Sequence, residues 1–225
     1  MIVQVYGVTT FEDAAAVNAL RPDHVGVVLD EDIDTWDSVN EATARAIVAQ
    51  LTDVNVVALS LSTDPGRVQR TVATVQPSLV HLARAVNGLG IDAVADLHEH
   101  LEPVGVMVTI PVQASTSIEI AQRYAAVADY LLLDTMHPET GIVGATGLPH
   151  DWSLSARIVG AVSVPVILAG GLGPNNVRDA INAVHPAGVD SETNTSRVDD
   201  RRHKDLDKVR RFIANARTAI GLNDG

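Results

Sequence analysis

The sequence predicts a single-domain (β/α)8 barrel spanning residues 1–225. Eight short apolar segments alternate with helical patterns, and no linker-like or low-complexity stretch interrupts the alternation. Two consecutive loops late in the chain are suited to binding phosphate, which such barrels commonly bind after strands seven and eight. With 225 residues, 46% of them hydrophobic, the chain is long enough to bury one large core.

The expected strands are short and largely apolar, and eight is the number that a closed barrel of this class needs. The first segment, residues 1–6, has no basic region before its apolar residues, so we expect a strand there and not a signal peptide. In chain order the strands are expected at residues 2–6, 24–29, 54–61, 78–82, 103–110, 129–134, 164–169 and 186–190.

A helical pattern follows each expected strand. Asp64-Pro65 marks the start of the third helix and Pro174 that of the seventh, because proline is favoured in the first turn. In chain order the helices are expected at residues 11–20, 40–51, 65–75, 92–101, 115–127, 153–162, 174–184 and 204–220.

The stretch from Val164 to Val177 predicts an anion site, because an apolar strand there breaks into glycines before a helix starts. Gly170 and Gly171 let the backbone approach a ligand closely, and free N–H groups at the positive end of a helix favour phosphate. The polar loop at residues 191–196 would supply the other half of the site. The alternative is a tight turn beside a solvated loop. We expect a small phosphorylated molecule as the partner.

The charge balance restricts the other partners. Against 28 acidic residues stand 16 basic ones, which gives a net charge of −12 and makes nucleic acids and anionic membranes unlikely partners. The longest apolar run, residues 104–112, is too short to span a bilayer, and a cytoplasmic location is expected. Abundant acidic residues with only two lysines indicate adaptation to a salty cytoplasm, that is, a halophilic protein. The oligomeric state stays open, and a homo-oligomer is compatible with the sequence.

Several kinds of site are not expected. The chain has no cysteine, which excludes thiolate metal sites and a thiol nucleophile. Both lysines, Lys204 and Lys208, are expected at the start of the last helix, which argues against a Schiff-base lysine inside the barrel. His98 and His100 do not share a helix face, and the acidic stretch at residues 30–37 lacks the glycine and terminal glutamate of a calcium loop. We therefore expect no metal and no cofactor.

Motifs along nearly the whole chain together resemble the phosphoribosylanthranilate isomerase family. They occur in the family's order: Gly7-Val8-Thr9, Leu131-Leu132-Leu133-Asp134-Thr135, Gly144-Ala145-Thr146-Gly147 with Asp151-Trp152, Leu168-Ala169-Gly170-Gly171-Leu172, Gly188-Val189-Asp190 and Lys204-Asp205. The resemblance implies a (β/α)8 barrel of tryptophan biosynthesis. It also implies an Amadori rearrangement that turns a ribosylamine into a 1-deoxyribulose.

The resemblance assigns roles position by position. Asp134 matches the family's general acid, which protonates the ribose ring oxygen so that the ring opens. A carboxyl group at the end of an apolar strand is expected to have a raised pKa, which suits this role, although a cap or turn residue is the alternative. The other matches are the family's phosphate loops, at Gly170, Gly171, Thr193 and Asn194, and its substrate-covering loop, at Gly144, Thr146 and Gly147.

The chain departs from the family at the proton acceptor and at the aromatic acid. The family's cysteine base corresponds to Tyr6, whose ordinary pKa of about 10 makes it a poor base. The family's arginine for the anthranilate carboxylate aligns near Thr35. His81 is either an acid–base group or a core histidine.

Three functions follow from these matches and departures. The first is isomerisation with Asp134 as acid and Tyr6 or His81 as proton acceptor. The second is an isomerase or lyase acting on a different sugar phosphate. The third is a non-catalytic protein that binds a phosphorylated metabolite.

Overall fold

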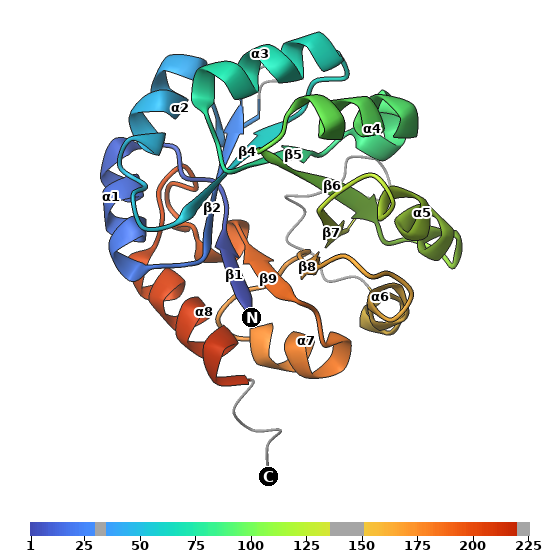
Figure 1. The fold of residues 1–225 in the computed structure, drawn as a ribbon. Helices are drawn as coiled ribbons and strands as arrows, with labels where there is room; N and C mark the ends of the chain where they lie inside the picture. Colours follow the sequence, from blue (N-terminus) through green and yellow to red (C-terminus); the bar gives the residue numbers. More distant parts are fainter. Residues whose placement is uncertain (30–34, 136–150, 220–225) are drawn as a thin grey trace.

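The computed structural model describes residues 1–29, 35–135 and 151–219, and these residues form a closed parallel barrel wrapped by helices (Figure 1). Eight strands close the barrel because β1 pairs with both β2 and the last strand, β9. The strands are β1 (Ile2–Val5), β2 (His24–Leu29), β4 (Asn55–Ser60), β5 (Leu79–Leu82), β6 (Gly105–Pro111), β7 (Tyr130–Asp134), β8 (Val166–Leu168) and β9 (Gly188–Ser191). The predicted (β/α)8 barrel is confirmed.

The helices form an outer ring around the barrel, each packed against the sheet through an apolar face (Figure 1). They are α1 (Phe11–Leu20), α2 (Glu41–Val48), α3 (Pro65–Val75), α4 (Ile91–His100), α5 (Thr116–Tyr124), α6 (Trp152–Val159), α7 (Val177–Val184) and α8 (Leu206–Thr218). Three short elements were not expected: β3 (Ser38–Val39) beside β2, a π-helical turn (Ala85–Leu89) and a 3-10 turn (Thr193–Thr195). None of the described helices is long and apolar enough to cross a membrane.

Side-chain caps fix several helix starts where the sequence predicted them. Asp64 accepts a hydrogen bond from the Gly66 N–H at 2.9 Å, at the start of α3. The seventh helix begins three residues later than expected, at Val177. The reason is that Asn176 turns its side chain back to bind the Gly173 N–H (2.8 Å) and the Gly171 carbonyl (3.0 Å), which keeps the preceding segment in a turn.

The core has two layers because alternate strand residues face the helices and the barrel interior. The larger layer lies between the sheet and the helices. The inner layer consists of Tyr6, Val28, Val57, Leu79, Met107, Leu132, Ile167 and Ala169. The barrel is thus a packed core, and Tyr6 belongs to its interior with 3% of its surface exposed.

Gly26 on β2 makes room for the Tyr6 ring. A Cβ atom on Gly26 would lie 2.0 Å from Cδ1 of Tyr6 and 2.1 Å from its Cε1. Any side chain at position 26 would therefore overlap the ring. A tyrosine at position 6 requires the glycine at position 26.

We expect Gly26→Ala to destabilise the protein by about 1–3 kcal/mol, the usual cost of overpacking a core, measured by urea denaturation. Gly160→Ala is the matched control, because a Cβ there would meet its nearest neighbour at an ordinary 3.6 Å. In a Tyr6→Ala background the cost of Gly26→Ala should largely disappear. An equal cost in both backgrounds would show that the Tyr6 ring is not the obstacle.

Candidate active site

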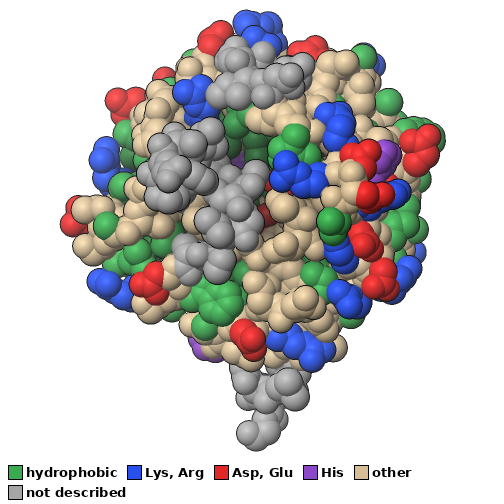
Figure 2. All heavy atoms as spheres, turned by 180° about the vertical axis from the view of Figure 1, so that it is seen from behind, with side chains coloured by type: hydrophobic (Ala, Val, Ile, Leu, Met, Phe, Trp, Pro, Cys, Tyr) green, Lys and Arg blue, Asp and Glu red, His purple; other side chains and the backbone are tan. Residues whose placement is uncertain are grey.

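The carboxyl-terminal ends of the strands converge at one end of the barrel, where chemistry in this fold resides. Seen from the side opposite to Figure 1, the molecule has a hollow near the centre of its face, and acidic and basic side chains gather on one side of it (Figure 2). We call the strand ends and the residues that follow them the mouth. Titratable groups from β1, β5, β7 and β9 meet there.

Asp134 ends β7 and provides a carboxyl group that can exchange a proton near neutrality. Its Oδ1 accepts a hydrogen bond from the Thr135 N–H at 2.6 Å. Burial raises the pKa of Asp134 from 3.8 to about 7, and this hydrogen bond opposes the shift only in part. Asp134 therefore lies at the end of a strand and is suited to general acid chemistry.

Asp190, on β9, is a second carboxyl group at the mouth that the sequence analysis did not single out. Its side chain is buried, with 7% of the residue exposed, and its Oδ1 accepts no hydrogen bond from any described group. Burial and repulsion by Asp134 raise the pKa of Asp190 to about 8, and the nearby polar groups Gln4 and Lys204 oppose the shift only in part. The motif Gly188-Val189-Asp190 contributed only to the family resemblance, because no local pattern shows that Asp190 lies near Asp134.

Lys204 lies at the mouth and not in the last helix, so the expectation for this lysine was wrong. The helix starts at Leu206, and a short antiparallel bridge between Ser196 and Lys204 turns the lysine inward. The Lys204 Nζ donates to the Glu192 carbonyl (3.1 Å) and to the Ser196 Oγ (2.9 Å). Burial lowers the pKa of Lys204 to about 8, although nearby acids, Glu192 first, oppose the shift. Lys208 does lie in the first turn of α8.

Tyr6 and His81, both named as candidate proton acceptors, are joined in a buried chain of hydrogen bonds. The Tyr6 hydroxyl lies 2.7 Å from His81 Nδ1, and His81 Nε2 lies 2.6 Å from the Thr109 Oγ1. Burial lowers the pKa of His81 to about 3. Burial, with Asp190 and Glu192 nearby, raises the pKa of Tyr6 well above 10. At neutral pH the chain is uncharged, which favours the packing interpretation of both residues.

The two predicted phosphate loops lie side by side and are tied together. Gly170 and Gly171 adopt φ angles of 83° and 66°, in the left-handed region that favours glycine. The Asn194 Nδ2 donates to the Gly171 carbonyl at 2.8 Å, next to the bond from Asn176. Among the described residues, no group accepts a hydrogen bond from the N–H groups of Gly170, Gly171, Thr193 and Asn194.

A cleft of about 260 Å³ lies beside these loops. Gly173, Asn176 and Asn194 line it together with two cations, Lys208 and Arg211. Free backbone donors next to cationic side chains suit an anion. The candidate substrate loop at Gly144, Thr146 and Gly147 lies outside the described residues.

Near Thr35, where the resemblance places an arginine, basic side chains arrive from another part of the chain. The Arg202 Nη1 donates to the Trp36 carbonyl at 2.8 Å, and the Arg201 guanidinium lies 4.8 Å from the centre of the Trp36 ring. The sequence analysis missed this contact, because the loop after β9 and the segment after β2 are far apart in the chain. Residues 30–34 of the acidic stretch lie outside the described residues.

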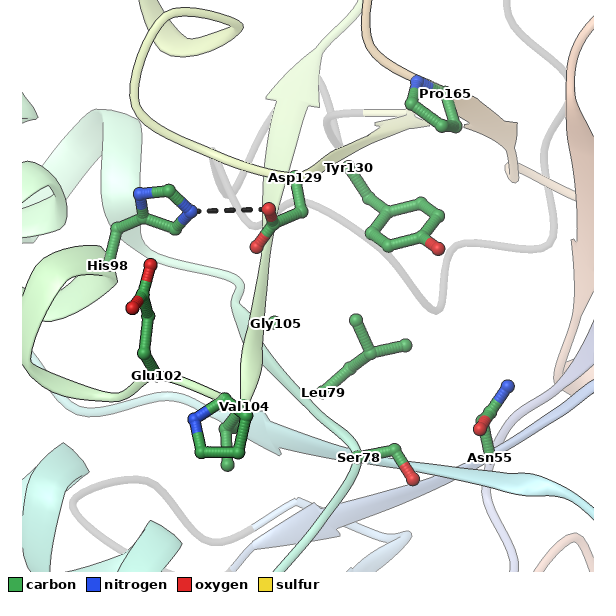
Figure 3. Close-up of a pocket in the computed structure, with 11 residues that line it drawn as sticks. Asn55, Ser78, Leu79, His98, Glu102, Val104, Gly105, Asp129, Tyr130 and Pro165 are labelled. Carbon is green, nitrogen blue, oxygen red and sulfur yellow. Dashed lines mark hydrogen bonds and ion pairs between the residues drawn. The ribbon is translucent and has the colours of Figure 1, made fainter.

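The opposite end of the barrel holds a cavity of about 940 Å³ (Figure 3). Residues at or just before the starts of the strands line it, among them Asn55, Gly105 and Tyr130. In it, His98 Nε2 and Asp129 Oδ1 are within hydrogen-bonding distance at 3.2 Å, and the second oxygen of Asp129 accepts a hydrogen bond from the Val106 N–H. These bonds connect α4 to the starts of β6 and β7. The cavity therefore lies at the amino-terminal end of the barrel strands, where residues in this fold contribute to stability and not to catalysis. In residues 1–29, 35–135 and 151–219, no group of three or more histidines and acids is arranged to hold a metal.

Comparison with known proteins identifies relatives along nearly the whole chain. The family model described as N-(5'-phosphoribosyl)anthranilate (PRA) isomerase matches residues 3–215. An N-(5'-phosphoribosyl)anthranilate isomerase from Haloferax volcanii is 38% identical over 99% of this chain and 96% of its own length. The corresponding protein of Methanocella arvoryzae is 36% identical over 96% and 97%. The haloarchaeal relative fits the composition, which predicts a halophilic protein.

Solved structures show the same fold. Phosphoribosyl anthranilate isomerase from Thermotoga maritima is 28% identical and superposes with a TM-score of 0.78, covering 96% of this chain and 99% of that one. A phosphoribosyl anthranilate isomerase in complex with reduced 1-(o-carboxyphenylamino)-1-deoxyribulose 5-phosphate is 27% identical, with a TM-score of 0.79 and the same coverage.

The raised pKa of Asp190 predicts a pH-dependent stability. The folded protein keeps this proton up to a pKa of about 8, whereas the unfolded chain releases it near 3.8. The native state therefore binds more protons between these values, and the contribution of Asp190 to stability falls as pH rises through this window. Asp190→Asn removes this titration. Relative to the wild type, its free energy of unfolding should rise by up to about 1.4 kcal/mol per pH unit in urea titrations.

Asp96→Asn, which changes an exposed carboxylate on α4, is the matched control and should not reproduce the trend. The comparison with the wild type at each pH cancels the titration of the histidines. A constant difference between Asp190→Asn and the wild type from pH 4 to 8 would contradict the raised pKa.

Proposed function

The chain belongs to the N-(5'-phosphoribosyl)anthranilate isomerase family, and we propose that it performs this isomerisation with Asp134 as the proton donor. It is an enzyme of tryptophan biosynthesis, an aldose–ketose isomerase that carries out an Amadori rearrangement. The observation that carries the assignment of Asp134 is its carboxyl group at the end of β7, inside a mouth that raises its pKa to about 7. A different sugar phosphate and a purely binding role are not favoured.

Asp134 has the properties that ring opening requires. The ribose ring opens when its oxygen receives a proton as the bond to C1 breaks, and a donor with a pKa near 7 is about half protonated at neutral pH. Burial, with repulsion by Asp134, raises the pKa of the second carboxyl group, Asp190, to about 8, so this group is also mostly protonated at neutral pH. The mouth therefore holds an exchangeable proton where the sugar is expected to bind.

The tied loops provide the anchor for the phosphate group. A phosphate between them would accept from the backbone N–H groups of Gly171 and of Thr193 or Asn194, close to the cations Lys208 and Arg211. A solved relative binds a deoxyribulose 5-phosphate derivative. For this chain we propose a phosphorylated ribosylamine as the substrate and a cytoplasmic location. One Thermotoga maritima structure is of monomers generated from a dimeric isomerase, so a homodimer is the assembly to test.

Purified protein should convert phosphoribosylanthranilate in a steady-state assay, and the gene should restore growth of a tryptophan auxotroph that lacks the isomerase. Asp134→Asn keeps the shape of the side chain but removes its exchangeable proton. We expect kcat to fall about 10²- to 10⁴-fold.

Asp96→Asn is the matched control for this substitution and should retain wild-type turnover. Near-wild-type turnover by Asp134→Asn would show that the acid lies elsewhere. Failure of the wild-type chain to turn over this substrate would contradict the proposed function itself.

A crystal soaked in sulfate should show an anion within hydrogen-bonding distance of the N–H groups of Gly171 and of Thr193 or Asn194. Asn194→Ala removes the side-chain bond to the Gly171 carbonyl, so it should weaken the binding of inorganic phosphate in calorimetry. Asn182→Ala, at an exposed position on α7 that does not line the cleft, is the control. Sulfate bound only at other places would argue against the anchor.

A further inference from the structure

The rearrangement needs a proton acceptor as well as a donor, and this inference rests on the proposed function. Once the ring has opened, C1 is doubly bonded to the nitrogen as an iminium group. A base must then remove the proton from C2. The buried and uncharged chain of Tyr6 and His81 is poorly suited to that step, because a phenol of raised pKa is fully protonated and an imidazole with a pKa of about 3 is a weak base.

Glu192 presents an unused acceptor beside the residue that follows Tyr6. Its Oε1 lies 2.8 Å from the point where a Cβ atom on Gly7 would be, so the carboxyl group occupies the space over the Gly7 backbone. Gly7 has a φ of 72° and lies directly after position 6 at the mouth. The Glu192 Oε1 is buried and accepts no hydrogen bond from any group in the described ranges. An acceptor oxygen without a partner is costly to bury, and a ligand that brings a proton would satisfy it.

Lys204 holds this carboxyl group in a charged environment. Its Nζ lies 3.3 Å from the same point above Gly7, fixed by the Glu192 carbonyl and the Ser196 hydroxyl. Burial and a hydrogen bond with Asp37 raise the pKa of Glu192 well above its ordinary value, and the ammonium group of Lys204 opposes this shift only in part. A raised pKa makes the ionised form of Glu192 a stronger base than an ordinary carboxylate, and the ammonium group of Lys204 favours that ionised form. Lys204 is thus a positioning residue.

The position of Glu192 is also compatible with Asp134 as the proton donor and with the proposed phosphate-binding loops. Glu192 follows β9 and Asp134 ends β7, with only β8 between them. Because neighbouring strands are about 4.8 Å apart, the two carboxyl groups rise from strand ends on the order of 10 Å apart, which a ribosyl group can bridge. Thr193, one of the proposed phosphate anchors, comes directly after Glu192. A phosphate held there keeps the sugar beside this carboxylate.

We propose that Glu192 is the catalytic residue that takes the proton from C2 of the ribosyl group. The C2–H bond breaks and its electron pair forms the C1=C2 bond, while the C1=N π pair moves to the nitrogen, which becomes a neutral amine. Glu192 then donates this proton to C1, where the C1=C2 π pair forms the new C–H bond. The enol O–H proton passes to Asp134, which lost its own proton on ring opening. The steps balance without an oxidant or a reductant.

The test is Glu192→Gln, assayed with phosphoribosylanthranilate carrying hydrogen or deuterium at C2. We expect kcat to fall about 10²- to 10⁴-fold and the isotope effect on kcat to grow, because removal of the C2 proton becomes slower than the other steps. Asp134→Asn, which impairs ring opening, should not enlarge the isotope effect. Binding of reduced 1-(o-carboxyphenylamino)-1-deoxyribulose 5-phosphate should change less than a few-fold. Glu119→Gln, at an exposed position on α5, is the matched control.

Each other outcome overturns the assignment in its own way. Equal turnover by the wild type and Glu192→Gln would overturn the assignment of Glu192 and leave the proposed function intact. A variant that loses binding of the analogue together with kcat, without a larger isotope effect, would show a structural role only. An inactive wild type would overturn the proposed function and this assignment with it.

Discussion

Closure of the parallel barrel is the constraint on which the rest of the structure depends. The first strand pairs with the last over Ile2 to Val5 and Gly188 to Ser191, so the two ends of the chain meet in one sheet. This pairing sets Gly7 beside Glu192, and the loop after β9 brings Lys204 to the same place. Because the interior below the mouth is filled with side chains, the polar groups at its rim lie at the boundary of a poorly hydrated region. Their altered pKa values follow from that position.

Tyr6, where the resemblance implies a cysteine, depends on contacts with several parts of the barrel. A tyrosine inside a closed barrel needs space and a partner for its hydroxyl. Gly26 provides the space. His81 provides the hydrogen-bond partner, and its other ring nitrogen is hydrogen-bonded to Thr109. Position 6 is therefore linked to three other strands. Substitution of Tyr6 alone would therefore leave three residues adapted to a phenol that is no longer there.

Much of the fold and part of the site could be predicted from the sequence. Apolar runs between helical patterns placed all eight barrel strands to within a few residues, because burial on both faces leaves a strong local signal. Asp134 and the glycine loop were found for the same reason, since both come directly after such runs. Lys204 and Glu192 were not, because their roles arise from long-range packing. No local pattern indicates that a lysine just before a helix folds back against the first strand.

The side chains of Asn176 and Asn194 both donate hydrogen bonds to the Gly171 carbonyl, and this shared acceptor has a consequence for binding. Two loops that already share an acceptor have little conformational freedom left to lose when a ligand arrives. Ordering of loops is one of the main entropic terms that oppose association. In this barrel the loops are already ordered when the protein folds, so binding does not carry this entropic cost again. Most of the attraction between the anion and the backbone donors therefore contributes to the net affinity. The side-chain amides that fix the geometry of these loops thus also influence how tightly the loops can bind a small anion.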